Sequence, residues 1–385
     1  MQATLYSRPD PAAGATCRLV AVGDLMLSGE VSRRHPPDRG PVHLFDDVAP
    51  ILRSGDIVFG NLETPLCDPP VKRTMFRAHP AFAQTLATAG FNVLSLANNH
   101  ILEYGPDSLQ QCARVVSECG IAVLGAGENQ AAACRPVIVN RHGLRVGFLG
   151  FGRTLQTQKD PSRPGFVEWD EDLAVREVRD LKGSVDILVV SIHIGYMWLD
   201  YPSPEFKAAA DRLLAEGAHV VLMHHAHVLQ GYQVRDGRLA IFNLGNFIAD
   251  ITEGETRVEP VPELQIESAV FLIDLDRRGV VAVAAVPIVM TPDLRVVVAP
   301  DEHARRIIDR NERIALEIES GAYRSGFWRQ RAELNTGHTL DWLVVHLRNR
   351  DWRELGTNLA KTRPHHLAML ARYAVGRLET LWKRL

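Results

Sequence analysis

Residues 219–227 read HVVLMHHAH and place three histidines directly after an apolar run. The run Val220–Met223 is short, free of charge and rich in β-branched residues, which is typical of a buried strand. Three imidazoles in the next four positions are hard to explain as packing, and clustered histidines favour metal binding. The stretch therefore predicts a strand whose carboxyl end carries metal ligands.

The same arrangement, an apolar run followed by polar residues, recurs at four earlier places. These places are Gly23-Asp24-Leu25-Met26, Asn61-Leu62-Glu63, Asn98-Asn99-His100 and Ser191-Ile192-His193-Ile194-Gly195. Taken singly, such an Asp or Asn often caps a turn or helix, and such a histidine is often a core residue. Open α/β sheets, however, bind ligands at the carboxyl ends of their strands, so together these residues predict one metal centre. Carboxylate, amide and imidazole groups suit Zn, Mn or Fe(II), and a divalent metal ion is the expected cofactor.

Apolar runs alternate with helical patterns over the first 230 residues, which predicts repeated βα units and an α/β fold. Predicted strands cover 18–27, 56–63, 91–97, 121–124, 146–150, 186–193 and 219–223. Predicted helices cover 80–89, 106–119, 171–181 and 204–216. Beyond Tyr232 the pattern changes to hairpins, with turns at Asp236-Gly237 and at 277–279. After Pro300 we expect helix to the end of the chain.

These patterns predict three parts. The parts are an N-terminal extension (1–16), an α/β domain (17–300) and an appended C-terminal helical segment (301–385). Near the end, basic residues and leucines alternate over 367–384. This pattern fits either a helix docked on the domain or a helix at a membrane surface.

The composition is that of an ordinary globular protein, with 385 residues, 46% hydrophobic and 23% charged. A net charge of −3 offers no basic field, so we expect no nucleic-acid partner. No window of about 18 apolar residues and no secretory signal are evident, so we expect no integral membrane segment and a cytoplasmic protein. Five cysteines without a CxxC motif argue against a disulfide framework or a thiolate zinc site.

Eight motifs follow one another in order between residues 19 and 248. They are GDLML, GDIVFGNLETPL, FRAHP, FNVLSLANNHILEYG, GIAVLGAG, SIHIGY, HHAHVLQG and IFNLGNFI. The series resembles the CapA family, named for poly-γ-glutamate capsule proteins, within the calcineurin-like metallophosphoesterase superfamily. The resemblance implies a four-layer α/β/β/α metallophosphoesterase-like sandwich. It does not cover the chain after Pro300.

The resemblance also implies a set of metal ligands. By position these are Asp24, Glu63, Asn99, His193, His225 and His227. Met26 stands where the superfamily has a further histidine ligand, and a thioether does not replace imidazole for such metals. One metal position then keeps Asp24, Glu63 and His227, and the other keeps Glu63, Asn99, His193 and His225. We therefore expect one tight metal site and a second site that is weak or absent.

Further residues are expected to act on the substrate. His100 resembles the superfamily's non-ligating acid, His224 is the other uncommitted imidazole, and Glu103 could orient an imidazole or interact with a helix N-terminus. Arg77 could hold a carboxylate bidentately or form a surface salt bridge. The other predicted substrate-binding residues are Asn98, Tyr196 and Asn246, the last of which could instead be a turn residue.

Three functions fit this reading, and a peptide or polyglutamyl substrate or partner is favoured over a phosphoester. Members resembling this chain include peptide epimerases of lasso-peptide pathways, and the favoured function is Cα epimerisation of a ribosomal peptide. In that reaction the metal stabilises an enolate while His100 and His224 exchange protons. The alternatives are a metallophosphoesterase or other hydrolase, and a factor that handles poly-γ-glutamate capsule polymer without catalysis. The sequence does not define the oligomeric state.

Overall fold

A computed structural model describes residues 1–9, 16–40, 42–68, 76–153, 160, 162–249 and 263–334. The chain divides into two compact units, Met1–Gly321 and Ala322–Leu385. In the second unit, residues 323–334 are helical. The predicted helix beyond 334 and the segment 367–384 lie outside the described residues.

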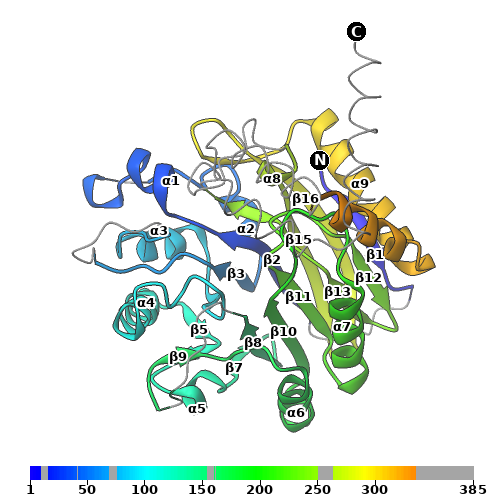
Figure 1. Cartoon of the computed structure of the whole chain (residues 1–385), viewed down its shortest axis with the longest axis horizontal. Coiled ribbons are helices and arrows are strands. Elements are labelled where there is room, and N and C mark those ends of the chain that lie inside the picture. The colour runs from blue at the N-terminus through cyan, green and yellow to red at the C-terminus, as the bar shows by residue number, and fades with distance from the viewer. Residues whose placement is uncertain are drawn as a thin grey trace, which may run out of the picture. The chain divides into compact units, whose positions relative to one another are not determined.

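One large sheet of the first unit has the strand order β1-β16-β15-β2-β3-β4-β5, with β14 beside β2 and β17 beside β16 (Figure 1). The strands are β1 (Ala3–Ser7), β2 (Cys17–Leu25), β3 (Ile57–Leu62), β4 (Val93–Ser95), β5 (Ala122–Leu124), β14 (Asn246–Ile248), β15 (Glu267–Asp276), β16 (Gly279–Met290) and β17 (Val296–Val298). Strands β2 to β5 run parallel to one another, as repeated βα units require.

A second sheet has the order β12-β13-β11-β10-β8-β7. Its strands are β7 (Val137–Arg141), β8 (Leu144–Gly152), β10 (Ile187–His193), β11 (Val220–His224), β12 (Tyr232–Arg235) and β13 (Arg238–Ile241). Strands β8, β10, β11 and β13 are parallel. A small separate pair consists of β6 (Ala126–Gly127) and β9 (Gly165–Phe166). Each strand predicted in the first 230 residues therefore exists in one of the two large sheets.

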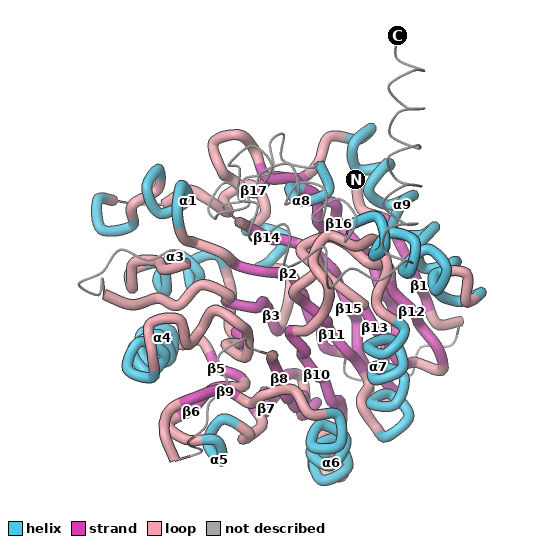
Figure 2. Tube along the Cα trace, viewed as in Figure 1, coloured by secondary structure: helices cyan, strands magenta, loops and turns pink. Residues whose placement is uncertain are grey.

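The helices lie on the outer faces of these sheets (Figure 2). Their bounds are α1 (Gly29–Arg34), α2 (Ala49–Leu52), α3 (Phe82–Ala89), α4 (Pro106–Glu118), α5 (Gln130–Ala133), α6 (Glu171–Leu181), α7 (Pro204–Glu216), α8 (Glu263–Ile266) and α9 (Asp301–Ser320), with a 3-10 turn at Pro37–Arg39. Helices α1 to α4 pack on the first sheet through one apolar cluster, and α6 and α7 pack on the second. Between the sheets lies another apolar cluster, where the rings of Phe59 and Phe148 stack 6.0 Å apart. The expected α/β/β/α layering is confirmed.

The hairpin predicted at Asp236-Gly237 joins β12 and β13. Asp236 has φ 50° and Gly237 has φ 71°, as a two-residue type I′ turn requires. The pairing of Arg235 with Arg238 across this turn fixes the register. The predicted hairpin turn at Asp236-Gly237 is therefore confirmed.

The two ends of the α/β domain differ from the predicted boundaries. Strand β1, within the expected extension, pairs antiparallel with β16. Helix α9, expected in an appended segment, belongs to the same compact unit as both sheets, and that unit ends at Gly321. Both elements pack on partners distant in the chain, which local sequence patterns do not reveal. None of the described helices is both long and apolar enough to cross a membrane.

Candidate metal centre

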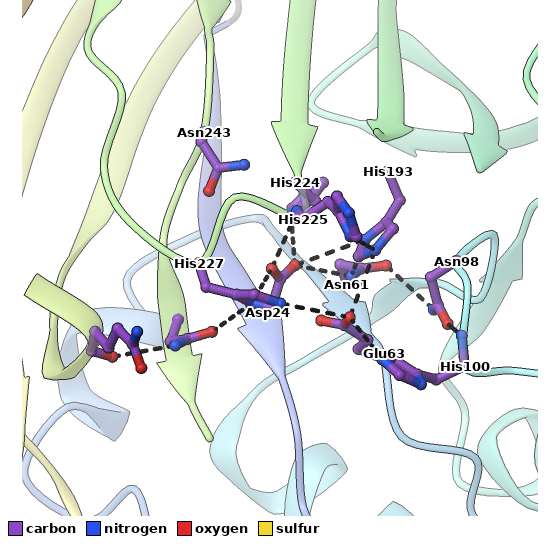
Figure 3. Close-up of polar contacts among 12 residues, drawn as sticks. Asp24, Asn61, Glu63, Asn98, His100, His193, His224, His225, His227 and Asn243 are labelled. Atoms are coloured by element: carbon purple, nitrogen blue, oxygen red, sulfur yellow. Dashed lines mark hydrogen bonds and ion pairs between the residues drawn. The ribbon is translucent and has the colours of Figure 1, made fainter. Parts of the chain in front are cut away.

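The polar ends of four strands meet at one place, where the two sheets face each other (Figure 3). In the second sheet, His193 of β10 lies beside His224 of β11. In the first sheet, Asp24 of β2 lies beside Asn61 of β3. The loop after β4 adds residues 98–100. The structure thus brings together the strand ends that the sequence singled out.

Asp24 is fully buried and faces four nitrogen donors, three of which form hydrogen bonds with it while the fourth, on His227, forms an ion pair. Its Oδ1 accepts from Asn61 Nδ2 (2.8 Å) and His224 Nδ1 (3.1 Å). Its Oδ2 accepts from the His225 backbone N–H (3.2 Å) and faces His227 Nδ1 (3.3 Å). Burial alone would raise the pKa of Asp24, but the bonds from His224 and His227 outweigh it and hold the pKa well below its usual value. An ionised carboxylate has about four lone-pair sites, so the chain itself satisfies Asp24.

Glu63 is equally buried, yet neither of its carboxylate oxygens has a hydrogen-bond partner among the described residues. Three imidazole Nε2 atoms face its Oε1, those of His193 (3.5 Å), His100 (3.6 Å) and His227 (3.9 Å). Burial, and next the charge of Asp24, raise the pKa of Glu63 to about 7. A buried carboxylate that accepts no hydrogen bond from the described residues is costly, so Glu63 suits a bound cation.

Glu63, His193 and His225 each offer a ligand atom within 4.8 Å of the others. His193 Nε2 lies 3.1 Å from His225 Nδ1. Burial, and next the neighbouring imidazoles, lower the pKa of His193 well below its usual value and that of His225 to about 4. Both rings are therefore neutral at pH 7 and have lone pairs to offer. With Glu63 they fit a divalent ion, and we name Glu63, His193 and His225 the first ligand group. The Oδ1 of Asn99, which was expected to join these ligands, is buried and has no partner in the part of the chain that the structure describes.

Asp24, Glu63 and His227 also offer ligand atoms within 4.8 Å of one another, and we name them the second ligand group. His227 Nδ1 bonds Asn246 Oδ1 at 2.9 Å. Burial opposes protonation of His227, but the charges of Glu63 and Asp24 outweigh it and raise its pKa to about 9. Met26, which is 7% exposed, adds no imidazole. At neutral pH this group holds a proton.

His100 lies at the edge of the centre with its side chain 15% exposed. Its Nδ1 bonds Glu103 Oε1 at 2.5 Å, so Glu103 orients this ring, as the sequence suggested. The ring of Phe76 stacks on the imidazole at 4.2 Å. With Nδ1 held on one side and a ring on its face, His100 presents Nε2 to Glu63. An imidazole held in this way has the chemistry to exchange a proton through Nε2.

Two predicted roles need correction because the side chains do not reach the surface. His224 is 0% exposed behind Asp24, so it cannot contact a substrate as a catalytic residue. Asn98 is also 0% exposed. Its Nδ2 donates to Leu62 O (2.8 Å), and its Oδ1 accepts from Ile101 N (3.1 Å). Asn98 therefore shapes the turn that carries His100.

The other three predicted substrate-binding residues differ in how far they are buried and in what they bond. Asn246 is 5% exposed, and its bond to His227 makes it a positioning residue. Tyr196 is half-buried and donates its hydroxyl to Glu205 (3.3 Å) on α7. Arg77 is half-buried and donates from Nη1 to Cys67 O (2.8 Å). The carboxylate binding expected of Arg77 stays a prediction, since its printed hydrogen bond goes to a backbone carbonyl.

Two residues of the centre received no role from the sequence. Asn61 lies within a quoted motif, but only the fold shows that its Nδ2 bonds both Asp24 and His193 Nδ1 (3.0 Å). Phe76 stacks on His100 and has φ 58°, a conformation that non-glycine residues rarely adopt. The position of Asn61 at a strand end was a signal that could have been used, whereas Phe76 had none.

Known proteins similar to this chain agree with the motifs. The sequence profile of the family described as "Bacterial capsule synthesis protein PGA_cap" matches residues 18–251. The chain is 29% identical over 286 residues to "Capsule biosynthesis protein CapA" of Bacillus anthracis, covering 70% of this chain and 66% of the relative. It is 27% identical over 246 residues to "PGA biosynthesis protein CapA" of Bacillus subtilis (strain 168), covering 61% and 63%.

Among solved structures, the calcineurin-like phosphoesterase YfkN from Bacillus subtilis is 12% identical with a TM-score of 0.44, covering 79% of this chain and 98% of that chain. The alignments span no more than about two thirds of either relative's length. The matched residues include every strand end of the centre. The chain belongs to the PGA_cap family of bacterial capsule synthesis proteins.

Proposed function

We propose that this protein is a metal-dependent hydrolase that cleaves amide bonds in a polyglutamyl or similar carboxylate-rich peptide chain. The observation that carries the proposal is the buried carboxylate of Glu63, which accepts no hydrogen bond from the described residues. It lies beside two neutral imidazoles, and His100 faces it. The substrate class is supported by the relatives, whose names place them in capsule and PGA biosynthesis.

Glu63, Asn99, His193 and His225 would hold one divalent ion. When bound, such an ion polarises a carbonyl oxygen and lowers the pKa of a water molecule. The donor set, one carboxylate, one amide oxygen and two imidazoles, suits Mn, Zn or Fe(II). The second ligand group, with a proton on His227, would hold a second ion weakly if at all.

His100 supplies the proton transfer. Glu103 accepts from Nδ1–H and fixes the ring, so Nε2 is the atom that exchanges a proton with the substrate. In amide hydrolysis, the oxygen of water bonds to the carbonyl carbon and the C–N bond breaks. His100 Nε2 accepts one proton from the attacking water and delivers it to the departing nitrogen, so that the products are a carboxylic acid and an amine.

Arg77 supports recognition of an acidic chain. Its guanidinium is half-buried and presents a planar fork of N–H donors that matches a carboxylate. The residue follows Phe76, which stacks on His100, so its backbone lies next to the proposed proton donor. A glutamyl carboxylate bound here would place the neighbouring amide near the centre.

Hydrolysis fits the centre better than epimerisation for a geometric reason. Epimerisation as envisaged from the sequence uses one imidazole on each face of the Cα atom. His224, the second imidazole, is fully buried and bonded to Asp24, which leaves His100 as the accessible one.

A test is to incubate the Mn(II)-loaded protein with a γ-glutamyl oligomer in D2O and to analyse the products by mass spectrometry. We expect shorter oligomers with new amino termini, and we expect His100→Ala to lose this activity while retaining metal. An oligomer of unchanged length carrying deuterium at Cα would instead indicate epimerisation. Intact, unlabelled oligomer, or equal cleavage by His100→Ala, would contradict the proposal.

A further inference from the structure

We propose that helix α9 positions the histidine ligands of the metal centre, although it lies outside the family match at 18–251. The inference rests on the metal centre proposed above. Two segments are involved, residues 194–203 after β10, named the β10 segment, and residues 225–231 after β11, named the β11 segment. His193 immediately precedes the first, and the second contains His225 and His227.

The two segments are bonded to each other. The Trp198 N–H donates to Ala226 O (2.9 Å), the carbonyl between the two histidines of the β11 segment. Gln230 is 4% exposed, and its Nε2 donates to Leu199 O (2.7 Å) and Tyr201 O (3.2 Å). These three hydrogen bonds join the β10 segment to the β11 segment at several points. A displacement of one segment therefore displaces the other.

Helix α9 holds the β10 segment through two arginines. Arg310 Nη2 pairs with Asp200 Oδ1 at 2.6 Å, and the two side chains are 16% and 19% exposed. Arg313 Nη1 donates to the Tyr201 hydroxyl at 3.1 Å. A largely buried ion pair is strongly sensitive to loss of one partner, so Arg310 fixes this segment.

The same helix holds the β11 segment by a backbone contact. Asn311 is 2% exposed, and its Oδ1 accepts from the Gly231 N–H at 3.0 Å. Gly231 has φ 77°, and a Cβ atom there would lie 2.8 Å from Ile314 Cγ2. The helix therefore packs directly on the loop backbone, four residues after His227.

The β10 and β11 segments contain three non-glycine residues with positive φ angles. Trp198 has φ 65°, His225 φ 92° and His227 φ 60°. Such conformations persist in non-glycine residues only where the surroundings impose them, and they cluster at functional sites. The bonds from α9 and between the segments supply that constraint. Without them the two imidazoles would turn away from the positions that the first and second ligand groups need.

The test measures the dissociation constant of Mn(II) by calorimetry on the full chain, together with the Tm of the protein in EDTA. The variants are Arg310→Met, Asp200→Asn and the double variant, with Arg305→Met, an exposed arginine of the same helix, as the matched control. We expect each single variant to weaken Mn(II) binding about tenfold, as loss of a partner that orients ligands does. The double variant should bind no worse than the singles, and the control should bind as wild type does.

The readouts separate the possible failures. All titrations are made at a temperature where the EDTA-treated variant is folded, so a purely structural role would lower Tm and leave the dissociation constant unchanged. That result in both Arg310→Met and Asp200→Asn would overturn the role of α9. Should Arg310→Met not fold, Asp200→Asn, which removes only the charge, decides the matter. Wild-type protein that binds no Mn(II) would overturn the metal centre itself.

Discussion

Asp24 and Glu63 are two fully buried carboxylates of one site, and the chain treats them differently. Asp24 receives four donors, and its pKa lies well below the usual value because the bonds from His224 and His227 outweigh burial. Glu63 receives none among the described residues, and burial with the charge of Asp24 raises its pKa to about 7. The comparison shows that the protein itself supplies the hydrogen bonds of Asp24, whereas Glu63 is left to bind a ligand.

The same contrast separates the two ligand groups. The first has neutral imidazoles on His193 and His225, beside Glu63, which accepts no hydrogen bond among the described residues. In the second, His227 has a raised pKa of about 9 and its Nδ1 is bonded to Asn246. A cation that binds the first group displaces at most the proton of Glu63. A cation that binds the second group must also displace the proton of His227, which the charges of Glu63 and Asp24 stabilise. We therefore expect the first group to bind a metal ion more tightly than the second.

The largest expected effect is on the stability of the metal-free protein, where substitutions of Asp24 and Glu63 should differ in their effect on the free energy of unfolding. Asp24→Asn leaves four donors facing an amide and should lower the free energy of unfolding by about 3–5 kcal/mol. Glu63→Gln should not destabilise the protein at pH 8, because folding raises the pKa of Glu63 and the ionised form then costs folding energy. Urea unfolding in EDTA measures both. Equal losses of stability in the two variants would contradict the distinction.

Glu63→Gln should nonetheless abolish metal binding, since Glu63 belongs to both groups. We expect the dissociation constant of Mn(II) to rise by more than about 100-fold, beyond the usual cost of losing a partner that only orients a ligand. Glu103→Gln is the matched control, because this carboxylate bonds His100 and should leave Mn(II) affinity near that of wild type. Retained affinity in Glu63→Gln would remove Glu63 from the metal centre.

The pH dependence of binding distinguishes the two groups. Below about pH 7, Mn(II) must displace the Glu63 proton, so affinity should fall about tenfold per pH unit. Above pH 7 an ion in the first group displaces no further proton, and affinity should level off. An ion in the second group would also displace the His227 proton, so affinity would continue to rise to about pH 9. Calorimetric titrations between pH 6 and 9 give this profile.

The smallest expected effect comes from adding a ligand. Met26→His restores an imidazole at the position where the resemblance implies one, and should allow a second, weaker ion to bind to the second group. Titration monitored by electron paramagnetic resonance would show about two Mn(II) per chain in this variant. Met26→Leu, which keeps an apolar side chain, controls for packing. If Met26→His binds no additional ion, Met26 is not what limits the second group.

Much of the fold and of the centre could be predicted because both depend on local patterns. Apolar runs mark strands, and the carboxyl ends of parallel strands share one edge, so Asp24, Glu63 and His193 could be expected together. The turn at Asp236-Gly237 followed from two residues that tolerate positive φ. Such signals lie within a few residues of the feature that they predict.

The rest depends on contacts between distant segments. The sequence could not show that His224 turns inward to Asp24, 200 positions earlier, while His225 presents its ring to His193. It could not show that Asn311 of α9 bonds the backbone beyond the histidines either. Hydrogen-bond partners chosen by the packed fold decide which of several polar residues ligate and which position the ligands.

The most direct test is metal content per chain by elemental analysis, after purification without chelators, for wild type, His225→Ala and His227→Ala. The account predicts about one tightly held ion in wild type, its loss in His225→Ala and its retention in His227→Ala. Two tight ions in wild type, or loss of the ion from His227→Ala with retention in His225→Ala, would contradict it.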